Sequence, residues 1–98
     1  MPTFVLMTKL STAVTAKMKD RASIGRAWLE RVKEKCPGVN FISHYGLLGP
    51  YDFLDIYEAP DEETAAKVSM ISLANGAEQA QSWMAIPYKR ILELASEI

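Results

Sequence analysis

His44 and Asp55 are the two residues of this sequence whose types and spacing are best suited to chemistry. They lie on either side of Gly49-Pro50, a dipeptide typical of turns between two strands. If Gly49-Pro50 is a two-residue turn, residues whose numbers sum to 99 face each other, and a four-residue loop gives the same pairing. His44 then lies opposite Asp55, with the two Cβ atoms about 5 Å apart.

A carboxylate at that distance orients and charges an imidazole. The pair is therefore a candidate general base with its orienting partner, a ligand anchor, or half of a metal site. The competing interpretation is a buried hydrogen-bonded pair at an interface between subunits. The sequence has no second histidine and no glycine-rich nucleotide-binding motif, so we expect neither a metal site nor a cofactor.

The elements that must position this pair follow from the hydrophobic pattern. Strands are predicted over residues 4–10, 39–48, 51–59 and 77–83, helices over 14–36 and 61–75, and a short terminal helix over 88–95. This order, β-α-β-β-α-β, is the split βαβ pattern, an α+β fold whose antiparallel four-stranded sheet has both helices on one face. We expect Gly25 to allow close packing on the sheet, and Gly49 to supply the positive φ of a tight turn.

The hairpin register divides the side chains between the two faces of the sheet. Because Leu54 and Ile56 are aliphatic and central, we expect their face to meet the helices. The opposite face would carry aromatic residues and the His44–Asp55 pair, and it would be too apolar to stay exposed in a monomer. We therefore predict a homodimer that closes over this face and encloses a space with five candidate ligand-binding residues: His44, Asp55, Tyr51, Tyr57 and Trp83.

Composition narrows the classes of partner. The chain has 98 residues, enough for a single domain spanning 1–98, and a formal net charge of -1. Without a basic field, nucleic acid and anionic membranes are not expected partners. A single cysteine, Cys36, allows no internal disulfide, and no apolar run approaches the roughly 20 residues of a membrane span. We expect a cytoplasmic protein.

The run from Leu48 to Asp61, LGPYDFLDIYEAPD, resembles the signature of the GYD-domain family. The family's G-x-Y-D element corresponds to Gly49, Tyr51 and Asp52, and the likeness extends over nearly the whole chain. The resemblance implies the dimeric α/β-barrel architecture of the ferredoxin-like superfold, which also includes small monooxygenases, muconolactone isomerases and effector-binding domains. The family itself implies no activity. For Tyr51 and Asp52, turn and backbone hydrogen bonding give a sufficient structural explanation.

Three functions remain open from the sequence. The first is a dimeric module that binds a small, partly apolar molecule between its sheet and its neighbours. The second is a cofactor-independent monooxygenase or isomerase that uses His44 with Asp55, so whether the chain is an enzyme stays undecided. The third is a structural or assembly module with a filled interior. A pocket of at least about 300 Å³ that touches His44 would favour the first two functions.

Overall fold

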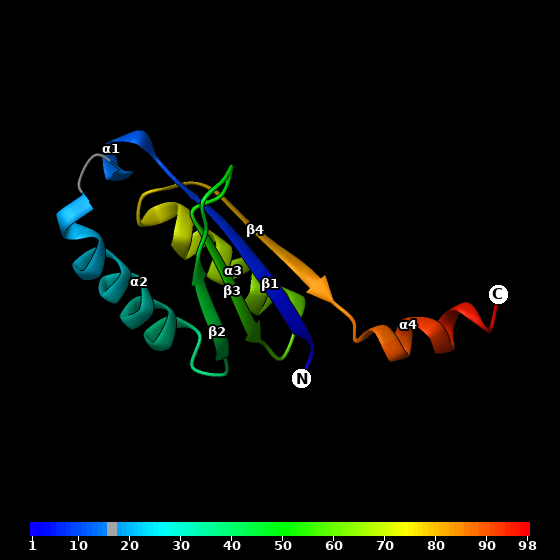
Figure 1. The fold of residues 1–98 in the computed structure, drawn as a ribbon. Helices are drawn as coiled ribbons and strands as arrows, with labels where there is room; N and C mark the ends of the chain where they lie inside the picture. The colour runs from blue at the N-terminus through cyan, green and yellow to red at the C-terminus, as the bar shows by residue number, and fades with distance from the viewer. Residues whose placement is uncertain (16–17) are drawn as a thin grey trace.

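The computed structural model describes residues 1–15 and 18–98. It contains a four-stranded antiparallel sheet in the order β2-β3-β1-β4, with helices α2 and α3 against one face (Figure 1). The elements are β1 (Thr3–Leu10), α1 (Thr12–Thr15), a 3-10 turn η1 (Met18–Asp20), α2 (Arg21–Lys35), β2 (Asn40–Gly46), β3 (Phe53–Glu58), α3 (Glu62–Ala74), β4 (Ala77–Ala85) and α4 (Tyr88–Ala95). The predicted α+β class, the order of strands and main helices along the chain, and the antiparallel four-stranded sheet are confirmed.

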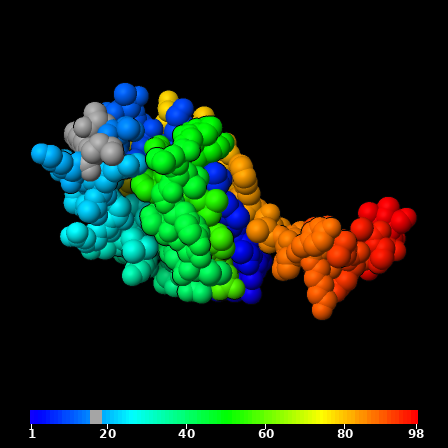
Figure 2. Space-filling view, in the orientation of Figure 1, coloured from blue at the N-terminus to red at the C-terminus, as the bar shows by residue number. Residues whose placement is uncertain are grey.

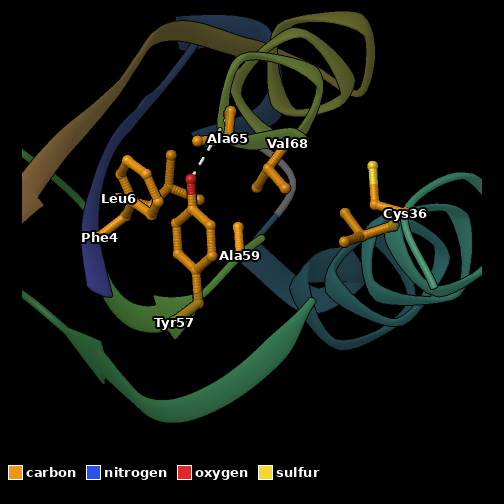
Figure 3. Packing of buried hydrophobic residues seen from close by; sticks show 8 residues of the cluster. Phe4, Leu6, Cys36, Tyr57, Ala59, Ala65 and Val68 are labelled. Carbon is orange, nitrogen blue, oxygen red and sulfur yellow. Dashed lines mark hydrogen bonds between the residues drawn. The ribbon is translucent and has the colours of Figure 1, made fainter. Parts of the chain in front are cut away.

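The core between the sheet and the helices is built around Tyr57 of β3, whose side chain is fully buried (Figure 3). Its ring lies 5.6 Å from the ring of Phe4, in a stacked arrangement, and 5.6 Å from the ring of Phe41. Its hydroxyl lies 2.7 Å from Ser82 Oγ and donates to the backbone oxygen of Ala65 at 3.5 Å. The hydroxyl is thereby satisfied inside an apolar core, which a buried polar group requires.

The predicted assignment of the two sheet faces is wrong. Tyr57 and Asp55 are buried beneath the helices, with 0% and 3% of their surface exposed. Since side chains alternate along a strand, Leu54 and Ile56 point to the uncovered face. There they lie beside Met7 and Val5 of β1, and Tyr45 and Trp83 extend the same apolar surface from β2 and β4.

The predicted hairpin register holds for part of β2 and then shifts. Gly46 pairs with Phe53 and His44 pairs with Asp55, as the sum of 99 requires. A bulge at Ile42 then moves Phe41 opposite Tyr57. Both Phe41 and His44 consequently face the helices, although their numbers differ in parity.

The connection between β2 and β3 is a loop rather than a two-residue turn. β2 ends at Gly46 and β3 begins at Phe53, and the backbone nitrogen of Leu47 donates to the oxygen of Asp52 at 2.8 Å. Among the residues described, only Gly76 has a positive φ, of 103°, so the positive φ expected at Gly49 is absent. Gly76 ends α3, where a Cβ would lie 2.6 Å from Val14 Cγ2.

The helix predicted over 14–36 is divided into α1, η1 and α2. The prediction also covered Ala16 and Lys17, which lie outside the described residues. Helix α2 ends where expected, with the backbone nitrogen of Cys36 donating to the oxygen of Val32 at 2.7 Å, directly before Pro37-Gly38. The predicted close packing of Gly25 is wrong, because a Cβ placed there would meet no atom within 4 Å.

Helix α4 matches its predicted bounds and projects away from the end of β4 (Figures 1 and 2). None of its residues is buried, and its apolar side chains recur at the spacing of one helical stripe, namely Tyr88, Ile91, Leu92 and Ala95. None of the helices in the described ranges is both long and apolar enough to cross a membrane.

Replacing Tyr57 by Phe should lower the free energy of unfolding by about 1 kcal/mol, because it removes a buried hydroxyl that bonds to Ser82 and Ala65. Urea denaturation of the purified protein measures this change. Tyr45→Phe is the matched control, since Tyr45 is 56% exposed on the opposite face, and it should change the free energy by less than about 0.5 kcal/mol. Equal effects of the two changes would contradict the central role of the Tyr57 hydroxyl.

Candidate functional site between the sheet and helix α2

A cavity of about 630 Å³ lies between the helix-facing side of the sheet and α2. Its walls are mainly apolar and come from both layers, including Ile24, Leu29, Trp28, Phe41 and Phe53. Polar side chains enter at a few points only, among them Thr8, Arg21, His44, Asp55 and Ser72. A mostly apolar concave space with a few converging polar groups is the usual form of a small-molecule site.

The cavity exists because α2 packs closely on the core at only one end. Val32, near its C-terminus, and the following Cys36 are buried in the core cluster with Tyr57. Nearer the N-terminus, Ile24 and Gly25 line the cavity instead, and the absence of a side chain at Gly25 leaves open space there. The interior between the two layers is thus divided into a packed half and a hollow half.

His44 and Asp55 face each other across β2 and β3 within this cavity. His44 Nδ1 lies 2.5 Å from Asp55 Oδ1, so the predicted contact between the two side chains is confirmed. The Asp55 side chain is 4% exposed, whereas the His44 side chain is 57% exposed. The imidazole is therefore the accessible part of the pair on the cavity side. Its ring is stacked on that of Phe53, with the ring centres 5.3 Å apart.

Burial raises the pKa of Asp55 above its ordinary value, and the charge of His44 and its hydrogen bond act in the opposite direction without cancelling this effect. Desolvation disfavours the ionised carboxyl, so His44 is the group that allows Asp55 to carry a charge inside the fold. The contact also fixes the orientation of the imidazole ring. Such a pair can hold a proton for a bound molecule or accept one from it.

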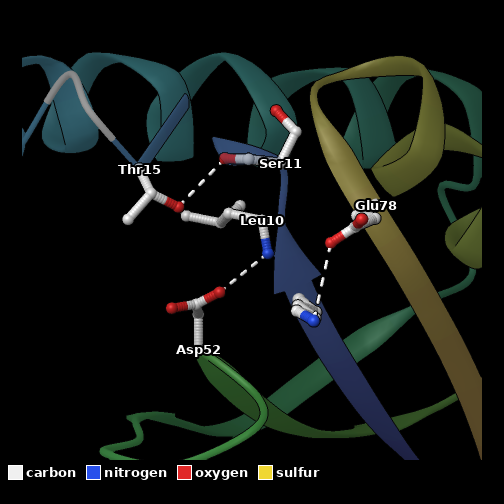
Figure 4. A network of polar contacts seen from close by, with 6 residues as sticks. Leu10, Ser11, Thr15, Asp52 and Glu78 are labelled. Atoms are coloured by element: carbon white, nitrogen blue, oxygen red, sulfur yellow. Dashed lines mark hydrogen bonds and ion pairs between the residues drawn. The ribbon is translucent and has the colours of Figure 1, made fainter. Parts of the chain in front are cut away.

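Arg21 lines the cavity and contacts Asp52 of the β2–β3 loop. The Arg21 Cζ atom lies 5.1 Å from the centre of the Phe53 ring, and its Nη2 lies 3.7 Å from Asp52 Oδ1. The other carboxylate oxygen of Asp52 accepts a hydrogen bond from the backbone nitrogen of Leu10 at 2.8 Å (Figure 4). Asp52 thereby ties the loop between β2 and β3 to the end of β1 and to the first residue of α2, which agrees with the expected role in backbone bonding.

Trp28 closes the inner side of the cavity. Its Nε1 donates to Ser72 Oγ at 2.8 Å, and its ring meets that of Phe41 edge-on at 5.3 Å. Trp28 is not among the ligand-binding residues predicted from the sequence. Arg21, Phe41 and Phe53 were likewise absent from the predicted site, and Phe41 is brought there by the β2 bulge.

The five predicted ligand-binding residues lie in three different places. His44 and Asp55 line the cavity, whereas Tyr57 is buried in the core. Tyr51 and Trp83 meet elsewhere, since the Tyr51 hydroxyl and Trp83 Nε1 both donate to Gln81 Oε1, at 3.3 and 3.1 Å. Gly49, of the resembled signature, is exposed in the β2–β3 loop. Over the described ranges, no three His, Cys, Asp or Glu side chains are grouped to hold a metal ion.

The strand order and the two covering helices define an α+β domain of the ferredoxin-like class. The chain matches the GYD domain over residues 4–95 and belongs to the GYD-domain family. It is 31% identical over 90 residues to a Thermus thermophilus protein named glutamine synthetase and cystathionine beta-lyase binding protein, with 89% of this chain and 90% of the relative covered.

A crystal structure of a protein from Thermus thermophilus has the same fold, with a TM-score of 0.58. The alignment covers 89% of this chain and 95% of that protein, at 20% sequence identity. Identity at this level shows a shared fold alone.

The opposite electrostatic environments of two aspartates give a direct test. Asp55 should titrate above 3.8, because it is desolvated, whereas Asp61, which accepts hydrogen bonds from Thr64 at the start of α3, should titrate below 3.8. Carboxyl carbon shifts in an NMR titration measure both pKa values. Equal midpoints, or an Asp55 midpoint below that of Asp61, would contradict the burial of Asp55.

The same two pKa shifts determine how the contribution of each aspartate to the free energy of unfolding changes with pH. A raised folded pKa means that Asp55 contributes stability that is fully present below pH 3.8 and is lost as the pH rises through the folded pKa. Asp61 contributes stability above pH 3.8 that is lost as the pH falls through its lowered pKa. The difference in unfolding free energy between the unmodified protein and Asp55→Asn or Asp61→Asn should therefore change with pH in opposite directions.

Proposed function

We propose that this chain is a small-molecule binding protein whose ligand occupies the cavity between the sheet and α2. The observation that carries the proposal is the cavity itself, at about 630 Å³ and in contact with the His44–Asp55 pair. That volume lies within the roughly 300–1,000 Å³ of known ligand pockets. It therefore exceeds the minimum volume stated above as favouring a binding or catalytic function. The ligand is partly apolar, because most of the cavity wall is apolar.

The cavity weighs against a purely structural module. Protein interiors are close-packed, and leaving the lining atoms of a void without contacts lowers stability. A domain that served only as a spacer would gain stability from larger residues at Gly25 or Ala22, both of which line the open space. An isomerase or a cofactor-independent monooxygenase would use the same His44–Asp55 pair on a bound molecule, so binding is the function common to both hypotheses.

Indole, a small neutral aromatic probe, should bind the cavity, and Gly25→Leu should weaken its binding at least about tenfold by filling the open space beside α2. Chemical-shift changes on titration with indole measure the affinity. Ala27→Leu is the matched control, because Ala27 lies on the exposed side of the same helix, outside the cavity lining. Equal affinities of the two variants for indole would exclude the cavity as the binding site.

We also propose that the chain forms a homodimer through the uncovered face of the sheet. This face carries Val5, Leu54 and Ile56 at its centre, with Tyr45 56% and Trp83 50% exposed beside them. Soluble monomers rarely leave so continuous an apolar surface in water. The enzyme binding that the name of the Thermus relative describes is a competing use of the same face, because a partner enzyme would also cover these residues.

Sedimentation of the purified protein alone should give twice the mass of the 10.9 kDa chain. Trp83→Glu should shift the protein to the monomer, because it buries a charge in the proposed interface. Met70→Glu is the control, since Met70 is 65% exposed on α3, on the other side of the sheet. A monomeric mass for the unmodified protein would overturn the homodimer and leave the face open to a different protein.

A further inference from the structure

We infer that Nε2 of His44 takes the proton of a weakly acidic hydroxyl group, so that the ligand of the cavity is a phenol or an enol with an apolar body. The inference rests on the proposed function, because it names the chemical class of the ligand of the same cavity. It follows from which nitrogen of His44 is already bonded, which lining side chains can accept a proton, and which walls surround them.

The two ring nitrogens of His44 differ in what they contact. Nδ1 lies 2.5 Å from Asp55 Oδ1, so this nitrogen is engaged within the protein. In the part of the chain that the structure describes, Nε2 makes no hydrogen bond. A carboxylate that holds one ring nitrogen orients the imidazole and leaves the other nitrogen for a ligand. Nε2 is therefore the atom of the pair that a bound molecule meets.

His44 is also the accessible base of the cavity. Among the described lining residues, only His44 and Asp55 have side chains that accept a proton, and the Asp55 side chain is 4% exposed. The hydroxyl of Ser72 is a far weaker base, and it already accepts a hydrogen bond from Trp28 Nε1 at 2.8 Å. A proton that leaves a ligand in this cavity therefore goes to His44.

Proton transfer to His44 adds no net charge to the cavity. The ligand O–H bond breaks, its electron pair stays on the oxygen, and the proton forms an N–H bond at Nε2. The resulting imidazolium lies between the ligand oxygen and the Asp55 carboxylate, which stabilises it. A neutral hydroxyl group enters a mostly apolar cavity at a lower desolvation cost than a group that is already charged in water.

The aromatic walls define the body that carries the hydroxyl group. The His44 ring is stacked on Phe53, and Phe41 lines the same cavity beside Trp28, whose ring it meets edge-on at 5.3 Å. Flat rings pack well against such walls. A hydroxyl group on an aromatic or conjugated body is also far more acidic than an aliphatic alcohol, so it is the kind that an imidazole can deprotonate.

The probe para-nitrophenol tests the inference, because its ionised form absorbs visible light and its neutral form does not. Bound to the full-length protein, it should ionise with a midpoint about one pH unit below that of the free probe. It should also bind about tenfold more tightly than para-nitroanisole or nitrobenzene, which lack the hydroxyl group. Absorbance titrations measure the midpoint, and chemical-shift titrations measure the dissociation constants.

Nitrogen NMR locates the proton directly, since His44 is the only histidine in the sequence. At a pH where the imidazole of the free protein is neutral, para-nitrophenol should move the Nε2 signal toward that of a protonated nitrogen. Because para-nitroanisole has no proton to give, it should leave the signal near its position in the free protein. An Nε2 signal that moves equally with both probes would contradict the proton transfer.

Substitutions separate the base from the other charged groups nearby. Besides the pair itself, these are Arg21 and Arg26 of α2 and Asp52, which contacts Arg21. All three groups are retained in His44→Gln, so the part of the midpoint shift that this variant loses belongs to the imidazole. We expect His44→Gln to lose most of the shift and to bind nitrobenzene as the unmodified protein does.

Asp55 acts as a positioning residue through His44, and the midpoint reports on this role. Asp55→Asn should reduce the midpoint shift, because a neutral amide does not stabilise an imidazolium, while the affinity for nitrobenzene stays the same. Asp61→Asn is the matched control, since it removes a carboxylate from the start of α3, outside the cavity lining. It should leave the midpoint shift unchanged.

A bound midpoint at or above that of the free probe, or a shift that survives His44→Gln, would overturn the inference. Loss of nitrobenzene binding in His44→Gln would overturn it as well, because His44 would then act on the shape of the cavity. The proposed function fails separately, through unchanged indole binding in Gly25→Leu. If indole binding weakens in that variant but the midpoint does not move, the protein binds small molecules without taking a proton from them.

Discussion

The burial of Tyr57 between the sheet and both helices is the constraint on which the rest of the structure depends. Its ring contacts Phe4 and Phe41, and its hydroxyl bonds to Ser82 and Ala65. Once Tyr57 points inward, the alternation along β3 directs Asp55 and Phe53 inward as well. One buried residue thus places the carboxylate, the aromatic wall of the cavity and, through strand pairing, His44.

The order of elements along the chain, the bounds of α4 and the pairing of His44 with Asp55 could be predicted from the sequence, because each depends on local periodicity or turn position. The face of the sheet that meets the helices could not be predicted in this way. Leu54 and Ile56 are the more aliphatic pair, and hydrophobicity alone therefore directs them to the core. Tyr57 prevails because Ser82 and Ala65 satisfy its hydroxyl, and these residues come from β4 and α3, distant in sequence.

The cavity could not be predicted from the sequence, for a related reason. Helical periodicity shows which side of α2 faces inward, but it does not show how closely each turn approaches the sheet. The bulge at Ile42 has no sequence signal of its own, yet it brings Phe41 and His44 to the same face. Arg21 depends on the placement of α2, since it reaches the cavity from the first residue of that helix and lies over Phe53.

The division of the interior into a packed half and a hollow half has a consequence for how such a protein can change. Val32, Cys36 and Tyr57 secure the fold at one end of α2, whereas Ile24, Gly25 and Leu29 border open space at the other. Residues of the second group can be replaced by larger, smaller or charged residues with little effect on the contacts of the first group. Mutation can therefore change the ligand preference of this domain while the contacts that secure its fold stay in place, an arrangement that lets one scaffold diversify among related proteins.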